Sequence, residues 1–283
     1  MPLIDFRARP NLPEYAKYLF PRLDAIQRQT NGSFGAYRPP VETLDAFVGR
    51  LDGIGIDRVV FAARNRESSG GWDLTNGLVA DCVARHPDRF VGFGGVDLEG
   101  PDLARQVTEA IAGLGLTGVC IDPFQIAADA ADERLDHVYA TCTRLGAPVI
   151  VTLGAMPGIA APLSCGNPLA LDIVAARFPD LLIVGSHSGW PFVTEMIAVA
   201  WRRENVYFEN SFYHHAPGAE TLVQAANTMI GHKMLYASAY PFSSIEETLD
   251  RFLLLEFDED VREAVLGGNA ERVLSAAATY SGS

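Results

Sequence analysis

Two arginines near the start of the chain, Arg7 and Arg9 in the run IDFRARP, carry the side chains best suited to anion chemistry. One residue separates them in a β-rich run, so both side chains leave the strand on the same face. Guanidinium groups stay protonated at ordinary pH and can hold a carboxylate or a developing enolate oxygen. The alternative is a buried structural network with Asp5, Asp122 or Glu209. We expect the anion site.

Proton transfer would need a titratable partner, and His187 is the first candidate. It begins HSGWP at the turn after an apolar strand, where an imidazole can act as general acid or base. A histidine with a purely structural role would fit the same sequence context. Asp122, in CIDPF, could orient His187, act as a base or pair with an arginine, and we favour the pairing. Tyr240 follows the last strand and could donate to an oxyanion or simply pack.

Several other side chains are candidates for contact with a substrate. Arg64, in AARNRES, could bind a substrate carboxylate or form a loop salt bridge. Trp190 and Phe212 offer an apolar wall for a ring-bearing substrate, although Trp190 stands in a turn that needs packing anyway. His214 and His215 are adjacent, so at most one of them would face a pocket, and we assign His214 to substrate binding.

Eight short β-rich runs could position these residues. Several are continuously apolar, as in PVIVTL and LLIVG, which is typical of parallel strands covered on both faces. The runs are Leu3–Phe6, Arg58–Ala63, Phe90–Val96, Gly118–Ile121, Val149–Leu153, Leu182–Gly185, Val206–Glu209 and Met234–Ala237.

Amphipathic stretches alternate with these runs, which predicts an α/β protein of the (β/α)8 TIM-barrel class. An open doubly wound sheet would need a glycine-rich phosphate loop after an early strand, and the first strand leads into Arg7-Ala8-Arg9-Pro10. The expected helices are Leu44–Leu51, Leu103–Leu114, Leu135–Leu145, Leu169–Phe178, Phe192–Trp201, Glu220–Met229 and Ile245–Leu255.

Two long segments follow strand ends, where barrel enzymes place their active sites. Residues 10–40 contain many aromatic and basic side chains, and residues 154–168 are rich in Gly, Pro and Ala. We expect residues 10–40 to form a lid on a single domain spanning residues 1–283.

Composition limits the partners. A net charge of −13 argues against nucleic acid and acidic membranes, so we expect a small anionic or aromatic substrate. No run approaches the roughly 18 apolar residues of a membrane span, and the N-terminus contains charges where a secretory signal would be apolar. The four cysteines show no C-x-x-C pair and predict reduced thiols. We expect a cytoplasmic protein, with a homodimer as the first guess for its assembly.

The order of motifs resembles the amidohydrolase-related family, the branch of the amidohydrolase superfamily with aromatic-acid decarboxylases and lactone hydrolases. The sixth-strand block and the closing GGNAERVL are the more specific pieces. The matching runs are IDFRARP, RHPDRFVGFGGVDL, LGAPVIVTLG, PLALDIVAARFPDLLIVGSHSGWPFVTEM, NVYFENS, KMLYASAYPF and GGNAERVL.

The resemblance implies a metal-dependent-hydrolase-like barrel, with ligands at the ends of the first, fifth, sixth and eighth strands. Those positions carry the pair Arg7 and Arg9, then Thr152, His187 and Ala239. Guanidinium groups repel a cation, and one imidazole cannot bind zinc tightly. We therefore expect no metal and no other cofactor, with Thr152 contacting substrate instead.

The resemblance and the replaced ligands leave several functions open. We place metal-independent hydrolysis of a small organic-acid ester or lactone first, and decarboxylation of a small aromatic or enoic acid second. Isomerisation also fits, since each reaction passes through an oxyanion that fixed cations can stabilise. A non-catalytic binding barrel and a relocated metal site built from Asp122, His187 and either His214 or His215 are further alternatives.

Overall fold

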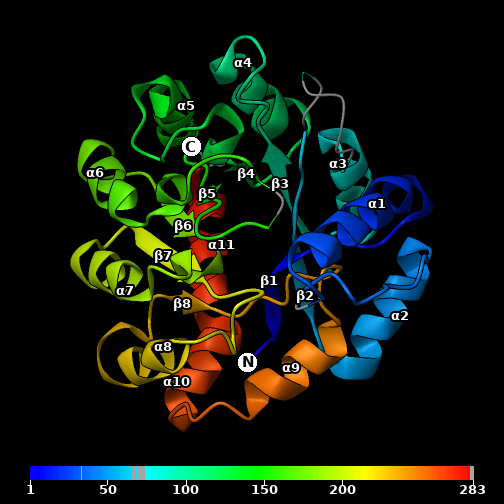
Figure 1. Cartoon of the computed structure of the whole chain (residues 1–283). Helices are drawn as coiled ribbons and strands as arrows, with labels where there is room; N and C mark the ends of the chain where they lie inside the picture. Colours follow the sequence, from blue (N-terminus) through cyan, green and yellow to red (C-terminus); the bar gives the residue numbers. More distant parts are fainter. Residues whose placement is uncertain (33, 66–67, 69–73, 158, 281–283) are drawn as a thin grey trace.

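The computed structural model describes residues 1–32, 34–65, 68, 74–157 and 159–280, and the side chains of residues 278–280 are left aside. Eight parallel strands form one sheet in sequence order, and helices surround it as a ring (Figure 1). The strands are β1 (Ile4–Ala8), β2 (Arg58–Ala62), β3 (Phe90–Gly95), β4 (Gly118–Ile121), β5 (Val149–Val151), β6 (Ile183–Gly185), β7 (Val206–Glu209) and β8 (Met234–Leu235).

Backbone hydrogen bonds join β1 to the segment that continues β8. The amide of Phe6 donates to the carbonyl of Tyr236 at 2.9 Å, and the amide of Ala239 donates to the carbonyl of Arg7 at 3.0 Å. These bonds close the sheet on itself, which confirms the expected (β/α)8 barrel.

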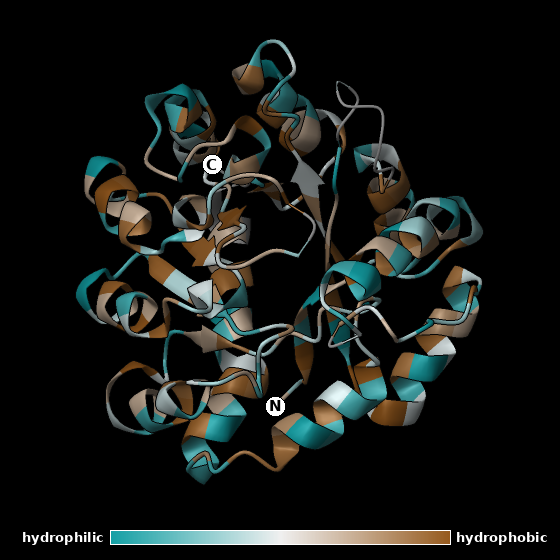
Figure 2. Cartoon of the chain, in the orientation of Figure 1, coloured by the Kyte–Doolittle hydropathy of each residue, from teal (hydrophilic) through white to brown (hydrophobic). Residues whose placement is uncertain are grey.

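Apolar side chains form an inner and an outer core. Inward-facing residues such as Phe6, Phe93 and Ile150 fill the barrel, while a larger cluster lies between strands and helices. Figure 2 shows the apolar colour concentrated along the strands. Helix α11 (Asn269–Tyr280) passes behind the strands in Figure 1, and its Ala270 and Val273 join the inner cluster. It therefore closes the barrel at the end opposite the strand C-termini.

The outer helices follow the expected amphipathic stretches, with short 3-10 and π segments at several ends. Helix α2 begins after the Thr43 side chain caps the amide of Ala46 and ends at Gly55, whose φ is 76°. The other helices are α4 (Leu103–Thr108), α5 (Asp136–Leu145), α6 (Leu169–Arg177), α7 (Val193–Arg202), α8 (Glu220–Ala225) and α9 (Ile245–Leu253), with α2 at Leu44–Ile54.

Four helices lie where the sequence analysis placed none. They are α1 (Pro13–Gln29), α3 (Asn76–Arg85), α10 (Glu259–Glu263) and α11. The first occupies much of the segment 10–40. Its buried residues Tyr15, Leu19, Leu23 and Ile26 repeat every three or four positions, which is a helical period, but Pro21 inside the run obscured it.

Strand bounds also differ from expectation where the site begins. The first strand extends to Ala8 rather than ending at Phe6, so Arg7 lies within β1 and Arg9 directly after it. The fifth and eighth strands end earlier than expected, before Thr152 and Tyr236. In the described part of the chain, no helix combines the length and apolar character needed to cross a membrane.

Candidate active site

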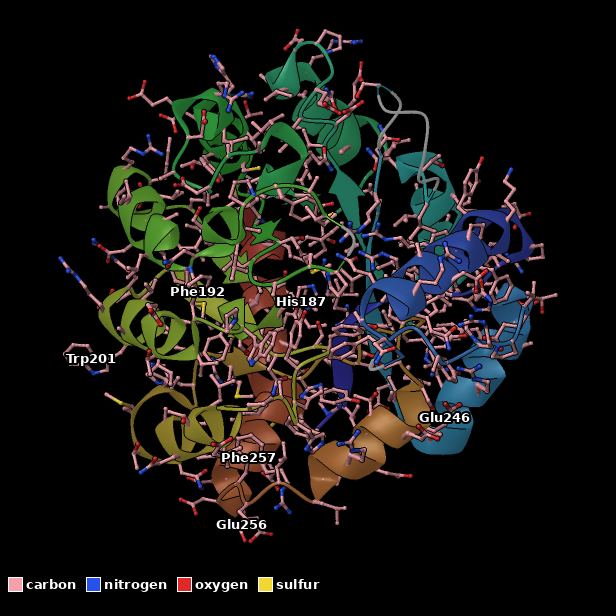
Figure 3. The ribbon with its side chains drawn as sticks, viewed as in Figure 1. His187, Phe192, Trp201, Glu246, Glu256 and Phe257 are labelled. Carbon is pink, nitrogen blue, oxygen red and sulfur yellow. The ribbon has the colours of Figure 1, made fainter. Side chains whose placement is uncertain are left out.

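A small cavity lies at the carboxyl ends of the strands, with a free volume of about 30 Å³. That volume holds about two water molecules. Its walls come from strand ends and its roof from α1 and the segment after β5. The lining residues are Arg7, Arg9, Arg22, Ile26, Arg64, Met156, Pro157, His187, Phe212, Ala239 and Phe242. Figure 3 shows His187 near the centre of the barrel, whereas Trp201 on α7 points away from it.

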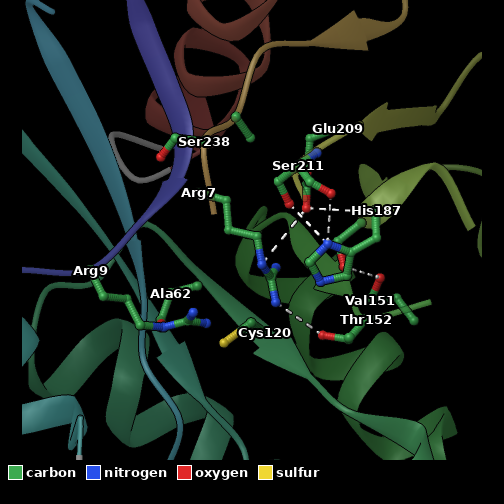
Figure 4. Close-up of polar contacts among 12 residues, drawn as sticks. Arg7, Arg9, Ala62, Cys120, Val151, Thr152, His187, Glu209, Ser211 and Ser238 are labelled. Atoms are coloured by element: carbon green, nitrogen blue, oxygen red, sulfur yellow. Dashed lines mark hydrogen bonds and ion pairs between the residues drawn. The ribbon is translucent and has the colours of Figure 1, made fainter. Parts of the chain in front are cut away.

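Arg7 is buried and held at two points (Figure 4). Its Nη2 donates to the Thr152 hydroxyl at 3.2 Å, and its Nε lies 3.7 Å from Oε1 of Glu209. Among the described residues, its Nη1 has no hydrogen-bond partner. The structural network considered from sequence is therefore present at Glu209, but it leaves one edge of the guanidinium unused.

Arg9 is equally buried and has no ion pair with a carboxylate of the described residues. Its Nε donates to the Ala62 carbonyl at 2.6 Å, and its Nη2 has no hydrogen-bond partner within the described ranges. Burial, followed by repulsion from Arg64 and Arg7, lowers the pKa of Arg9 to about 10, so the group stays charged at neutral pH. A buried cation without a counter-ion is costly and calls for an anionic ligand.

Arg64 and Asp122 form the ion pair that the sequence analysis favoured for Asp122, with Nη1 2.9 Å from Oδ2. Burial alone would raise the pKa of Asp122, but Arg64 and a hydrogen bond from Thr152 outweigh it and lower the pKa. Asp122 is thus an ionised partner of Arg64 and a weak base. It does not contact His187 among the hydrogen bonds of the described residues.

His187 presents one ring nitrogen to the cavity. Its Nδ1 lies 3.1 Å from the Ser211 carbonyl and 2.9 Å from the Ser211 hydroxyl. A carbonyl can only accept, so the proton resides on Nδ1 and the unpartnered Nε2 is an acceptor. Burial, then the charge of Arg7, holds the pKa of His187 well below its usual value, and the imidazole is neutral.

Glu209 and Ser211 are the supporting residues that the sequence analysis did not assign to the site. Glu209 Oε2 accepts from the Ser211 amide at 2.6 Å, and Oε1 accepts from the His187 amide at 3.3 Å. One carboxylate therefore fixes the two backbone segments that carry His187 and its Ser211 partner. The sequence gives no signal for this bridging role of Glu209, because in the run VYFENS a glutamate at the end of an apolar strand is an ordinary polar strand terminus.

Backbone conformation is also unusual around the cavity. His187, Phe212 and Ala239 have φ values of 59°, 72° and 62°, a region that residues with side chains rarely occupy. All three line the cavity. Such conformations persist where the surroundings enforce them and concentrate at functional sites.

Three other expected site residues lie outside the cavity. The Tyr240 hydroxyl donates to Glu42 at 3.0 Å, and its ring stacks on Phe47, so Tyr240 packs here and its hydroxyl is not among the groups that line the cavity. The Nε2 of His214 bonds the Ala237 carbonyl at 2.8 Å and its ring packs in an aromatic cluster, so His214 does not contact this cavity either. Trp190 lines two neighbouring pockets rather than the cavity itself.

The donor set does not fit a divalent metal. Among the described residues, no group of three or more His, Cys, Asp or Glu side chains is placed to hold one. Arg7 reaches across to Thr152, so a fixed cation already lies between two of the positions where metal-using relatives of this fold would have ligands.

Comparisons with known proteins agree with the barrel. An uncharacterized TIM-barrel protein from Bordetella bronchiseptica is 32% identical, with a TM-score of 0.85 over 98% of this chain and 100% of that one. A manganese-bound dihydroxybenzoic acid decarboxylase from Polaromonas is 18% identical, with a TM-score of 0.67 and 97% of each chain covered, and shows the fold alone.

A curated relative supplies a named activity. The 2-amino-3-carboxymuconate-6-semialdehyde decarboxylase of Dictyostelium discoideum is 25% identical over 231 residues, which is 69% of this chain. This chain covers 64% of that relative, less than two thirds of its length. The sequence profile of the amidohydrolase family matches residues 27–275. The chain is a member of the amidohydrolase family, as its motifs indicated.

Proposed function

We propose that this protein is a decarboxylase of a small aromatic or enoic acid and that it works without a metal ion. One observation carries the proposal: Arg7, Arg9 and His187 line the same buried cavity, and each has a polar side-chain atom with no hydrogen-bond partner among the described residues. Two are donors, Arg7 Nη1 and Arg9 Nη2, and one is an acceptor, His187 Nε2. Such atoms are rare in folded proteins, and a bound acid with a neighbouring hydroxyl would satisfy all three.

The arginines should bind an oxygen that becomes more negative during the reaction. A guanidinium paired with the departing carboxylate would stabilise the reactant, because CO₂ leaves as a neutral molecule. We therefore place at Arg7 and Arg9 a hydroxyl or enol oxygen next to the carbon that loses CO₂. Fixed donors in a dry site stabilise such an oxyanion strongly.

His187 would move one proton. Its neutral Nε2 accepts the hydroxyl proton of the substrate, and the resulting oxyanion binds the arginines. The imidazolium then returns the proton to the carbon bearing the carboxylate. When the carbon–carbon bond breaks, its electron pair moves through the substrate to the oxygen held by Arg7 and Arg9, and CO₂ departs. Solvent supplies the last proton to that oxygen. The bound anion helps His187 hold a proton, because a nearby negative charge raises an imidazole pKa.

Hydrolysis, which we placed first from sequence, has weaker support. Ala239 occupies the usual carboxylate position and Asp122 is committed to Arg64, so His187 would have to activate water without help from a carboxylate at either position. The relatives with named activities described above are decarboxylases. A purely binding role is also less favoured, since the cavity gathers Arg7, Arg9 and His187 rather than leaving them apart.

A panel of hydroxybenzoic acids, enoic acids and lactones tests the proposal, with CO₂ and product measured for each. We expect CO₂ release that survives treatment with a chelator. Arg7→Ala should reduce the rate at least about 100-fold, as loss of an oxyanion donor does. Arg50→Ala removes a guanidinium on the outer side of the barrel, where it pairs with Glu42, and serves as the control.

Three results would contradict the proposal. Unchanged CO₂ release in Arg7→Ala would remove the arginine from the mechanism. Lactone opening without CO₂ release would restore the hydrolase interpretation. Activity lost on chelation and regained with manganese would show that a metal acts after all.

A further inference from the structure

A second pocket adjoins the arginine cavity, and we call it the upper pocket. It has a free volume of about 360 Å³, within the range of small-molecule sites. Met156 and Pro157 line both spaces, so they form the partition between them. Moving these two residues aside would join the cavity that contains Arg7 and Arg9 to the larger upper pocket.

The upper pocket is apolar in character. None of its described lining residues carries a charge, and four are aromatic: Phe34, Phe124, Trp190 and Tyr213. The rings of Trp190 and Tyr213 stack with centroids 4.7 Å apart. Their polar ends are already satisfied, because Trp190 Nε1 donates to the Pro217 carbonyl and the Tyr213 hydroxyl donates to Ala155. Only ring surface remains for a ligand.

The arginine cavity is too small for a whole ring-bearing acid, since its free volume of about 30 Å³ holds only water. Any such substrate must displace a wall. Met156 is the wall residue best able to give way, because its unbranched side chain has three rotatable bonds. Its movement opens the way into the upper pocket.

A third pocket, of about 450 Å³, borders the cavity on another side, across Phe212 and Phe242. That wall is braced, because Phe212 stacks on Phe34 with centroids 4.6 Å apart. The third pocket also contains Glu247 and Arg251, whose charges suit an apolar group poorly. The upper pocket is therefore the better compartment for the apolar part of a substrate.

We infer that the substrate is an elongated amphipathic acid. Its acidic and hydroxyl groups bind Arg7, Arg9 and His187, and a planar apolar arm passes Met156 into the upper pocket, against Trp190. The inference rests on the proposed function for the acidic end only. It adds a compartment and a chemical class for the other end, and it names Met156 as the residue that limits access.

Binding of two acids tests the inference. 2-Hydroxybenzoate carries only the acidic end, and 5-phenyl-2-hydroxybenzoate adds an apolar arm. Trp190 lines both the upper and the third pocket and reports binding in either one, while the variants below distinguish the two. A variant with Trp72→Phe and Trp201→Phe leaves Trp190 as the single tryptophan. Trp72 lies outside the described residues, and Trp201 is 65% exposed and points away from the barrel in Figure 3. We expect the phenyl compound to bind about tenfold more tightly and to alter Trp190 emission, a gain of about 1.4 kcal/mol.

Two variants locate the arm. Ala161→Phe fills part of the upper pocket without adding a tryptophan and should abolish the tenfold gain while leaving 2-hydroxybenzoate affinity within about twofold. Met156→Ala opens the partition and should increase the gain. Phe242→Ala opens the opposite wall and is the matched control, for which the gain should not change.

The outcomes separate this inference from the proposed function. If 2-hydroxybenzoate binds and the phenyl group adds nothing, or if Phe242→Ala rather than Met156→Ala increases the gain, the inference is overturned and the proposed function is unaffected. If both acids bind as expected and no CO₂ forms from any acid of the panel, the apolar compartment is supported and decarboxylation fails. If neither acid binds, both are overturned.

Discussion

At the scale of single residues, the buried charge of Arg9 lowers the stability of the folded protein. Arg9 is 2% exposed, carries a full charge at neutral pH and has no carboxylate partner in the described structure. A chain selected only for folding would place an apolar side chain there, because an unpaired buried cation opposes folding. The ligand would supply the missing negative charge.

Arg9→Met should therefore stabilise the protein while removing its activity. Removing the buried charge should raise the free energy of unfolding by about 1–4 kcal/mol. Losing the hydrogen bond to the Ala62 carbonyl should lower it by about 1 kcal/mol. We expect a higher urea midpoint and a loss of at least about 100-fold in kcat/KM. Arg50→Met is the control: it breaks ion pairs with Glu42 and Glu246 and should lower stability. A destabilised Arg9→Met protein would show that Arg9 has a structural partner.

His187 should remain neutral through the physiological range. Burial and then Arg7 hold its pKa well below 6.5, so its imidazole NMR signal should not titrate between pH 6.5 and 8. The unfolded chain binds this proton more readily, so the contribution of His187 to stability should fall as pH drops below 6.5. The signal is assigned by its absence in His187→Gln. A midpoint at or above 6.5 in the ligand-free protein would contradict the prediction.

Sequence reasoning named three residues that line the candidate cavity but did not define the boundary of that cavity. Arg7, Arg9 and His187 follow from strand alternation and from their place at strand ends, because parallel strands of a barrel end on one face. Tyr240 and His214 also follow strand ends, yet their side chains turn outward to Glu42 and to the aromatic cluster. Which way a side chain turns after a strand depends on loop conformation, and sequence spacing does not specify it.

At the scale of elements, α1 forms part of the roof. Its Arg22 Nη2 donates to the Pro157 carbonyl at 2.8 Å, which ties α1 to the segment after β5 above the cavity. The sequence analysis expected a lid at residues 10–40 but assigned Arg22 no role. Its side chain reaches the cavity only because α1 lies across the barrel mouth, and that placement depends on contacts far apart in the sequence.

Arg22→Met should loosen this tie. A hydrogen bond from a charged donor contributes about 1.5 kcal/mol, so opening of the roof should become roughly tenfold more frequent. We expect faster amide hydrogen exchange in residues 13–29 and 154–157. Arg28→Met changes an exposed arginine at the end of the same helix and is the control. Equal exchange in the two variants would show that Arg22 does not hold the roof closed.

At the scale of the whole molecule, the barrel depends on the seam between β1 and the segment after β8. Asp5 is fully buried there, and its Oδ1 accepts hydrogen bonds from the Arg7 amide at 3.0 Å and the Ser238 amide at 2.9 Å. The carboxyl thus bridges β1 and the segment after β8. Its Oδ2 has no hydrogen-bond partner in the part of the chain that the structure describes. Sequence patterns predicted the eightfold repeat but not this bridge. In the sequence, Asp5 is only an isolated polar residue in an apolar strand, and nothing indicates which amides its carboxyl contacts.

Asp5 should give the folded protein a distinct pH dependence. Burial raises its pKa from 3.8 to about 6, against the opposing hydrogen bonds of Ser238. Between pH 4 and 6 the folded chain keeps a proton that the unfolded chain has lost, so this group's contribution to stability falls as pH rises. The shift corresponds to about 3 kcal/mol in total.

The variant Asp5→Asn tests this pH dependence, because its side chain keeps an acceptor for both amides and does not titrate. The stability of Asp5→Asn relative to wild type should therefore rise by up to about 3 kcal/mol from pH 4 to 6.5. Urea unfolding at both pH values measures the difference, with the exposed Asp88→Asn as the control. If the two proteins keep a constant difference across this range, the carboxyl of Asp5 is not perturbed and the seam holds an ordinary ionised aspartate.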